Sequence, residues 1–409
     1  MKPTPVIRRR LISVLGNIAL ALLGLGMALG LMEFLLRTYP NLVPRDVRVD
    51  PPVRRIPTSN SQTYDVKLSS GDLYYWMRGS IAPVPPDQDT VLAQVHLTTD
   101  ANGFRNSLSE SAGYDIVALG DSFTVGGNVA TPWPQMLAEF SESSVLNLGE
   151  AGDGPQQELE ILRRYGLAPS PRWVILAYFE GNDLYDAASY AQASPFILPR
   201  FGKYIVERGL EALSESRSAS AEAIIEPSYR YPIEVTVGGT DLGMAFFSYY
   251  ISWLSVNSEA IESSQNYRLV GESILKMREL SESEEARFLL VYVPSKEHVY
   301  LPYLNDADLL EPVFTDVPTL ELDGAGFLQF TSESATPELT RQHMDDQVNL
   351  WADFAAGQNI FFLDLTSTFQ EEAGIGAELY YPFDTHWNQS GHDLAAQTIA
   401  QYIENISMP

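Results

Sequence analysis

Short apolar runs alternate with helical patterns from Asp115 to the C-terminus. The apolar runs are four to seven residues long and lie at Ile116–Leu119, Val145–Leu148, Trp173–Phe179, Phe288–Val293 and Ile360–Leu363. Continuous rather than alternating hydrophobicity predicts strands that are buried on both faces, as in a parallel sheet. Helical patterns lie between them, at Pro134–Phe140, Gln156–Tyr165 and Asn266–Leu280. This rhythm predicts an α/β fold, a doubly wound and mainly parallel five-stranded sheet flanked by helices.

A long apolar stretch precedes this pattern and predicts a transmembrane anchor over residues 11–36. Leu11–Met32 contains no charged residue in 22 positions. As a helix it would be roughly 33 Å long, enough to cross a hydrocarbon core of about 30 Å. Three arginines at positions 8–10 precede it. By the positive-inside rule, residues 1–10 are therefore expected in the cytoplasm and the rest of the chain outside it.

The alternative for this stretch is a cleaved signal peptide. Ala28-Leu29-Gly30 has the small-x-small pattern of a cleavage site. The apolar run is longer than an ordinary signal core and continues through Phe34-Leu35-Leu36, which favours a retained anchor. Both interpretations place the body of the protein in an extracytoplasmic compartment, in the periplasm or at the cell surface.

The rest of the chain divides into an entry segment and a larger domain. Residues 37–110 are expected to form a stalk and entry segment, because 37–90 is rich in proline and polar groups and a strand leads into a turn at Asn102-Gly103. Residues 111–409 are expected to form the larger α/β domain.

That domain carries a predicted insertion at 184–287, with a hairpin that turns at Gly238-Gly239 and an aromatic-rich stretch at Phe246–Trp253. A second stretch, Tyr300–Pro337, is expected to be irregular.

Composition excludes several classes of function. The net charge is −27, and without the basic residues 1–10 it is −31, so the body repels phosphate backbones and nucleic-acid binding is not expected. The chain has no cysteine, which excludes a thiolate nucleophile and cysteine metal ligands. No two histidines stand at helical ligand spacing, so neither a metal nor a cofactor is expected.

Three polar motifs follow predicted strands in a fixed order. They are Gly120-Asp121-Ser122-Phe123-Thr124, Gly181-Asn182-Asp183 and Asp384-Thr385-His386-Trp387-Asn388. In doubly wound sheets, ligands bind beyond the carboxyl ends of the strands. A serine, an amide and a histidine with a nearby carboxylate are the groups that acyl transfer through a serine ester needs.

Ser122 is the candidate nucleophile. It lies on the turn from the first strand to a helix, where the backbone N–H groups of the helix start are free to stabilise an oxyanion. His386 is the candidate base and Asp384 the group that orients it. Taken alone, the first motif could equally be a turn capped by Asp121 or Ser122.

Two further residues are candidates for the oxyanion hole beside the N–H of Ser122. Gly152 lies in the glycine-rich turn after the second strand, and Asn182 carries an amide that can donate to an oxyanion. Their alternatives are a plain strand-end turn and a helix cap. Among the other histidines, His298 also follows a strand, whereas His392 is expected to face solvent on a helix.

Together these blocks resemble the SGNH, or GDSL-like, hydrolase superfamily. The resemblance covers the chain from about Asp115 onward, apart from the insertion. It implies a flavodoxin-like fold with Ser122 as nucleophile, His386 and Asp384 as its partners, and Gly152 and Asn182 in the oxyanion hole. Typical members have the aspartate three residues before the histidine. The Asp-x-His-Trp form found here is similar to alginate-acetyltransferase-type members.

The resemblance extends to a membrane-anchored bacterial subgroup, through Asn102-Gly103-Phe104-Arg105 and Pro294-Ser295-Lys296-Glu297. It implies a serine esterase or O-acyltransferase acting on ester groups, above all O-acetyl groups, of a glycan or similar polar substrate. A membrane-bound O-acyltransferase is a candidate partner. Arg105 and Lys296 are candidate substrate contacts, with structural ion pairs as their alternative. A non-catalytic glycan-binding scaffold and a lipase or phospholipase remain alternatives.

Overall fold

The computed structural model describes most of the chain as two compact units. The described residues are 5–39, 43, 61–68, 71, 73, 90–106, 113–168, 170–193, 196–202, 204–206, 233–304 and 307–407. One unit comprises Met1–Val53 with Gln192–Ala223, and the other comprises Arg54–Ala191 with Ile224–Pro409. The larger unit contains all five predicted core strands and is described first.

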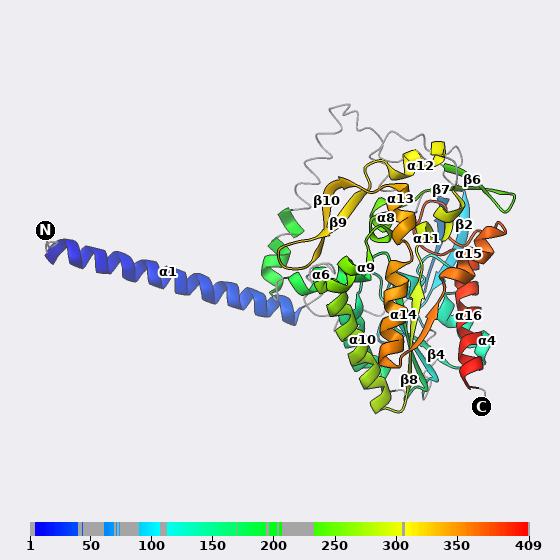
Figure 1. The fold of residues 1–409 in the computed structure, drawn as a ribbon. Helices are drawn as coiled ribbons and strands as arrows, with labels where there is room; N and C mark the ends of the chain where they lie inside the picture. Colours follow the sequence, from blue (N-terminus) through cyan, green and yellow to red (C-terminus); the bar gives the residue numbers. More distant parts are fainter. Residues whose placement is uncertain are drawn as a thin grey trace. The chain divides into compact units, whose positions relative to one another are not determined.

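Its centre is a five-stranded parallel sheet (Figure 1). The strands are β3 (Ile116–Gly120), β4 (Val145–Asn147), β5 (Trp173–Phe179), β8 (Arg287–Val293) and β11 (Phe361–Asp364). Their order across the sheet is β11-β8-β5-β3-β4, and every neighbouring pair is parallel. The fold predicted from the apolar runs is confirmed. Because β3 lies between β4 and β5, the order of the strands reverses beside β3, where such sheets bind ligands.

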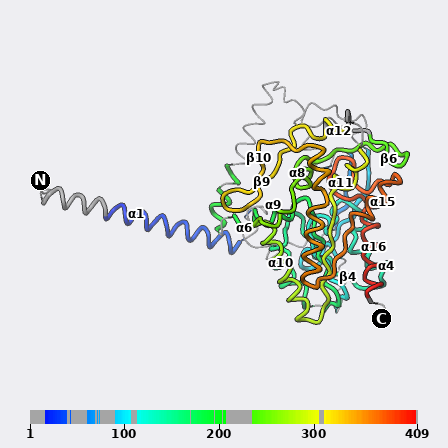
Figure 2. Tube along the Cα trace, viewed as in Figure 1, coloured from blue at the N-terminus to red at the C-terminus, as the bar shows by residue number. Residues whose placement is uncertain are grey.

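Helices cover both faces of the sheet (Figures 1 and 2). One face packs against α5 (Pro155–Ile161), α10 (Gln265–Ser283) and α14 (Asp346–Gln358), and the other against α4 (Trp133–Ser141), α15 (Thr366–Gly374) and α16 (Gln389–Ser407). Successive side chains of a strand point to opposite faces. Accordingly, Val117 and Leu119 of β3 pack on the face covered by α5, α10 and α14. Ile116 and Ala118 pack on the face covered by α4, α15 and α16. All four are buried, which explains why the run carries no polar alternation.

The remaining elements are short. The hairpins pair β1 (Gln62–Lys67) with β2 (Val91–Leu97), β6 (Ile233–Val237) with β7 (Thr240–Met244), and β9 (Pro318–Leu322) with β10 (Leu328–Ser334). The short helices are α3 (Ser122–Val125), η4 (Leu162–Gly166), α6 (Asp183–Gln192), α8 (Ser248–Leu254), α9 (Ser258–Ser263), α11 (Lys296–Tyr300), η5 (Leu301–Tyr303), α12 (Ala307–Phe314) and α13 (Pro337–His343).

These elements refine the predicted organisation. The hairpin at Gly238-Gly239 is confirmed, because β6 and β7 pair on either side of it. The expectation that Tyr300–Pro337 is irregular was wrong, since β9 and β10 form a hairpin there. Within the predicted insertion 184–287, α10 packs on the sheet as a crossover helix. Of the predicted stalk 37–110, β1 and β2 are paired, whereas the prolines of 37–90 lie outside the described residues.

The smaller unit contains α1 (Pro5–Thr38). Its segment Gly16–Thr38 is long and apolar enough to cross a membrane, and none of its most hydrophobic window is buried. Near its end, Leu36 packs in an apolar cluster with Val43, Ile197, Phe201 and Tyr204. Part of the predicted insertion therefore belongs to the same unit as α1.

Candidate active site

The turn after β3 presents Ser122 at the start of α3. Gly120, the last residue of β3, has a φ of +146°. A Cβ there would lie 2.3 Å from Thr124 Oγ1 and 3.0 Å from the Ala177 carbonyl oxygen, so the turn requires glycine. Asp121 caps α3 by accepting a 2.9 Å hydrogen bond from the Phe123 N–H. As the first helical residue, Ser122 has an N–H without an acceptor in its own helix.

Ser122, His386 and Asp384 form one chain of hydrogen bonds. Ser122 Oγ lies 2.8 Å from His386 Nε2, although the two residues are 264 positions apart. On the other side of the ring, His386 Nδ1 lies 2.5 Å from Asp384 Oδ1. The same Oδ1 accepts the backbone N–H of His386 at 2.8 Å. The structure therefore brings the three predicted residues together in the order that a serine acyl transfer needs.

A closed loop holds Asp384 and His386. Tyr380 and Trp387 form an isolated antiparallel bridge, and the Tyr381 N–H donates to the His386 carbonyl at 3.1 Å. Trp387 is buried and stacks on Phe369 with ring centroids 5.0 Å apart. Since this bridge closes the loop on a packed indole, the histidine is presented by a rigid turn.

The electrostatics of the site keep Asp384 ionised. Burial alone would raise the pKa of Asp384, but the charge and hydrogen bonds of His386, together with the Lys296 ammonium, hold that pKa below its usual value. Burial raises the pKa of Asp121 to about 6, against the hydrogen bond from Phe123 and the charge of His386. Thus the carboxylate that orients the histidine is charged at neutral pH, as its role requires.

Further acids lie buried behind this turn, and the sequence analysis did not single them out. Burial, with the charge of Asp121 as the next cause, raises the pKa of Asp186 to about 8. Burial likewise raises the pKa of Glu158 and of Asp183 well above their usual values. Asp183 accepts the Phe179 N–H at 2.8 Å and so fixes the end of β5. The sequence signal that could have indicated these buried acids is the presence of acidic residues after buried strands.

The two other oxyanion-hole candidates follow the neighbouring strands. Asn182 directly precedes α6, and its side chain forms a hydrogen bond that lowers the pKa of Asp121. Gly152 has a φ of +77° and is exposed in the loop after β4. The Glu150 N–H in that loop donates to the Gly120 carbonyl at 2.9 Å. Both residues thus lie on loops attached to the turn of Ser122, and their roles stay predictions.

Lys296 and Arg105, the predicted substrate contacts, both bind backbone carbonyls. Lys296 is 1% exposed, and its Nζ donates to carbonyls of the loop that carries Asp384. The Arg105 guanidinium donates to carbonyls of the segment after α3, at Val125, Gly126, Val129 and Ala130. Burial lowers the pKa of Arg105. Both side chains therefore support loops next to Ser122, and their roles as substrate contacts stay predictions.

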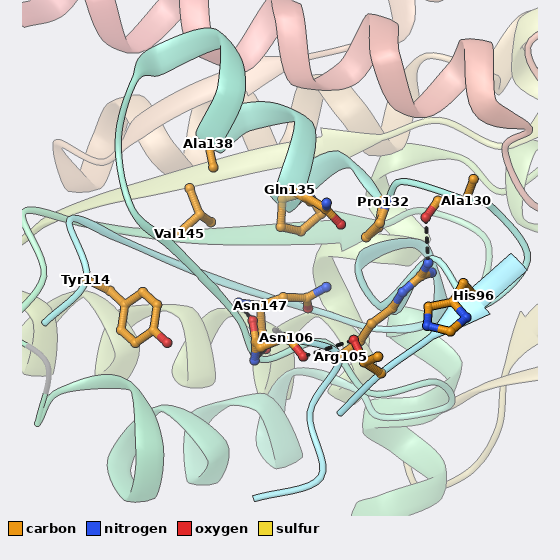
Figure 3. Close-up of a pocket in the computed structure, with 12 residues that line it drawn as sticks. His96, Arg105, Asn106, Tyr114, Ala130, Pro132, Gln135, Ala138, Val145 and Asn147 are labelled. Atoms are coloured by element: carbon orange, nitrogen blue, oxygen red, sulfur yellow. Dashed lines mark hydrogen bonds between the residues drawn. The ribbon is translucent and has the colours of Figure 1, made fainter. Parts of the chain in front are cut away.

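A cavity of about 440 Å³ lies beside Arg105 (Figure 3). It is lined by residues of β2, the turn after it, the start of α4, and β4, namely His96, Thr98, Arg105, Asn106, Tyr114, Ala130, Pro132, Pro134, Gln135, Ala138, Val145 and Asn147. The Arg105 guanidinium and the Asn106 amide both bind backbone carbonyls there (Figure 3). Ser122, Asp384 and His386 do not line this cavity.

His298 and His392 are both fully buried. His392 was expected to face solvent, which was wrong, because it is fully buried and its Nδ1 accepts the Trp133 N–H at 3.2 Å. His298 lies between Glu180 (2.9 Å) and Asp345 (3.1 Å). Burial alone would lower the pKa of His298, but these carboxylates raise it to about 10. Among the described residues, no group of histidine and acidic side chains has the geometry of a metal site.

Comparison with known proteins finds one family model and several solved structures that are similar to parts of this chain. Residues 329–408 match the family model ALGX, described as "SGNH hydrolase-like domain, acetyltransferase AlgX". The matched segment includes β11, α15, α16 and the Asp384–Trp387 loop, whereas Ser122 lies before it. No curated protein matches the chain significantly.

Several solved structures are similar to this chain at low identity. A GDSL-like lipase from Bacteroides thetaiotaomicron has 12% identity and a TM-score of 0.32, with 71% of this chain and 88% of that chain covered. A putative SGNH hydrolase from Slackia heliotrinireducens has 14% identity and a TM-score of 0.33, with 71% and 99% covered. A catalytic mutant of an acetylxylan esterase from Geobacillus stearothermophilus has 12% identity and a TM-score of 0.34, with 71% and 94% covered.

Proposed function

We propose that the protein is a serine esterase or O-acyltransferase that forms an acyl-enzyme on Ser122. The observation that carries the proposal is the hydrogen-bond chain from Ser122 Oγ through His386 to Asp384, at 2.8 and 2.5 Å. The match to an SGNH hydrolase-like family supports ester hydrolysis or acetyl transfer as the chemistry. A protein that only binds glycans would have no use for a base within hydrogen-bond reach of a serine hydroxyl.

In the first half-reaction, Ser122 Oγ attacks the acyl carbonyl of the substrate. His386 Nε2 accepts the hydroxyl proton while the new Oγ–C bond forms, and Asp384 stabilises the imidazolium through Nδ1–H. The tetrahedral intermediate then collapses. The bond from the acyl carbon to the leaving alcohol breaks, and His386 returns its proton to that alcohol. The acyl group remains on Ser122.

In the second half-reaction, an acceptor hydroxyl releases the acyl group. His386 takes the proton of the acceptor as its oxygen attacks, and then gives a proton to Ser122 Oγ as the ester bond to the enzyme breaks. Water as acceptor gives hydrolysis, and a sugar hydroxyl gives transfer. In both half-reactions we assign the negative charge of the intermediate to the N–H groups of Ser122 and Gly152 and to the Asn182 amide.

For the substrate, we propose O-acetyl groups on a glycan or a similar polar molecule. The support is the acetyltransferase description of the matched family. We further propose that α1 is retained as a membrane anchor and that the catalytic unit works outside the cytoplasm, because three arginines precede the apolar segment of α1. A membrane-bound O-acyltransferase that supplies acyl groups is the partner that suits such a location.

The experiment uses the full chain in detergent with 4-nitrophenyl acetate, with and without an oligosaccharide acceptor. We expect release of 4-nitrophenol and, with the acceptor, acetylated oligosaccharide detected by mass spectrometry if transfer is the reaction. Release without an acetylated product identifies an esterase. If 4-nitrophenol is released in neither arm and Ser122→Ala has no effect on cells, the proposed enzymatic function is wrong and a glycan-binding scaffold is favoured.

A further inference from the structure

Lys296 is a fully buried ammonium with three carbonyl partners. Its side chain is among the largest that are completely inside the protein. Nζ donates to the carbonyl oxygens of Tyr381 at 3.0 Å, Pro382 at 3.2 Å and Asp384 at 2.8 Å. An ammonium has three N–H donors, and burying it without hydrogen bonds would cost several kcal/mol. The three bonds satisfy all its donors and make this position of Nζ the stable one.

The three carbonyls belong to the loop that carries the base and its orienting acid. The Tyr380–Trp387 bridge closes this loop. The carbonyls of Tyr381, Pro382 and Asp384 point to Nζ, and the Pro382 carbonyl also accepts the Ala245 N–H at 2.9 Å. Asp384 connects the two sets of contacts, because its carbonyl accepts from Lys296 while its carboxylate binds His386. A shift of Nζ therefore shifts the orienting acid.

Lys296 is itself held in place from both sides. It is the first residue of α11, and the preceding Ser295 donates its N–H to Glu180 at 2.7 Å. The following Glu297 accepts the Phe247 N–H at 2.6 Å. Because β8 leads directly into this turn, the position of the ammonium is set by the central sheet.

We propose that Lys296 is a positioning residue that fixes the geometry of the Asp384–His386 pair from inside the loop. The proposal deepens the proposed function and rests on it. It assigns no substrate contact to Lys296. Its consequence is that removal of the ammonium lowers catalysis through the alignment of His386 rather than through binding of the substrate.

The test compares Lys296→Met with Lys276→Met, a matched control on the exposed side of α10. We expect kcat for 4-nitrophenyl acetate to fall about 100-fold in Lys296→Met with little change in KM, since a misplacement of about 1 Å has that effect. The low-field proton signal of His386 Nδ1–H should also be lost. Lys296→Arg, which keeps the charge, should recover part of kcat. An unchanged kcat and proton signal in folded Lys296→Met would overturn the proposal.

A measurement on the unmutated protein covers the case in which Lys296→Met does not fold. The chain has five lysines. After labelling with ¹⁵N-lysine, we expect one ammonium whose protons exchange slowly with water, absent from Lys296→Arg. No protected ammonium would overturn the proposal. Neither NMR measurement depends on turnover, so failure of Ser122 to react with an acyl substrate would contradict the proposed function separately.

A second inference comes from the smaller unit, where a short helical segment is fastened to α1. The Glu33 carboxylate accepts the N–H of Ile197 at 2.9 Å and of Leu198 at 2.8 Å. Ile197 is buried against Val43 and Leu36. The segment is helical at 197–202 and 204–206, and it therefore begins beside the last turns of the apolar helix.

The segment exposes apolar side chains and has a basic composition. Phe196, Ile205 and Val206 are 56%, 54% and 59% exposed. Positions 197–206 contain two basic residues and no acid, in a chain of net charge −27. Apolar and basic residues together are typical of segments that lie in the interface of an anionic bilayer. We infer that residues 196–202 and 204–206 lie in the lipid interface at the end of α1, with α1 spanning the bilayer.

The test uses the absence of cysteine. Single cysteines at Phe196 and Val206 are labelled with a nitroxide in the full chain, in nanodiscs that contain phosphatidylglycerol. Leu22→Cys is the membrane control, and Ile375→Cys, 72% exposed, is the aqueous control. We expect positions 196 and 206 to collide with oxygen more than with a water-soluble nickel complex, as position 22 does. Collision behaviour like that of position 375, or a water-exposed position 22, would overturn the inference.

Discussion

Asp384 Oδ1 binds two nitrogens of a single residue, His386. It accepts the backbone N–H at 2.8 Å and lies 2.5 Å from Nδ1. The backbone bond holds the carboxylate in place, and the ring bond directs Nε2 towards Ser122 Oγ at 2.8 Å. A spacing of two residues, shorter than the three typical of the superfamily that the sequence resembles, is therefore sufficient to align the acid with the imidazole.

Asp384→Asn should lower kcat by about 10³-fold or more. An amide at this position keeps the shape but favours the tautomer with a proton on Nε2, which cannot accept one from Ser122. The measurement is kcat for 4-nitrophenyl acetate, with the exposed Asp353→Asn on α14 as control. If Asp384→Asn retains more than about a tenth of kcat, Asp384 is not the orienting acid.

Gly120→Ala should destabilise the protein by about 2 kcal/mol or more, because the new methyl would overlap the Thr124 hydroxyl in a backbone conformation that alanine rarely adopts. Urea unfolding measures the change. Gly357→Ala, with open space around its Cβ, is the matched control. Equal stability of the two variants would show that the turn before Ser122 is not tightly constrained.

Arg105→Met should lower stability by about 2 kcal/mol without raising KM for 4-nitrophenyl acetate. Its guanidinium bonds to four carbonyls between Val125 and Ala130, which lose their donor in the variant. Arg172→Met is the control, since that side chain is 71% exposed. A large rise in KM at unchanged stability would instead support a substrate contact.

The free energy of unfolding should fall between about pH 6 and pH 9. Asp186, with a pKa of about 8, keeps a proton that the unfolded chain releases near pH 4, so its contribution declines as the pH rises to about 8. The pKa of His298 is raised to about 10 in the folded protein. Its contribution to the free energy of unfolding is therefore fully present below about pH 6.5 and is lost as the pH rises towards 10. The lowered pKa of His392, about 3, acts in the opposite direction, but only below about pH 6.5.

Urea unfolding across this range measures the effect, with Asp186→Asn as the diagnostic variant. Asparagine cannot ionise, so the stability of the variant relative to the unmutated protein should increase by at least about 2 kcal/mol from pH 5 to pH 8. Stability that increases from pH 6 to pH 9 would contradict the burial of these groups.

The sheet could be predicted because its strands are buried on both faces. A continuous run such as Trp173–Phe179 has no polar position, and the strand β5 has the same bounds as the prediction. Ser122 could be proposed because it follows such a strand, and His386 because an aspartate precedes it by two residues; α15 separates His386 from the last strand, β11. The contact between Ser122 and His386 could not be derived from spacing alone, since 264 positions separate them.

Other features depend on tertiary contacts that leave little trace in the sequence. His392 was placed on a solvent-facing helix, but α16 packs on α4, and the Trp133 N–H binds the buried ring. Lys296 was expected to contact substrate or to form a structural ion pair, because a lysine is rarely buried unless it is paired. Its three carbonyl partners come from a loop that is 85 or more positions away.

Mass spectrometry of the intact chain after reaction with a fluorophosphonate tests the central claim most directly. The account predicts one adduct, located on Ser122, absent in Ser122→Ala and formed far more slowly in His386→Ala, because only a serine activated by its histidine reacts readily. No adduct on Ser122, or equal labelling in Ser122→Ala, would contradict it.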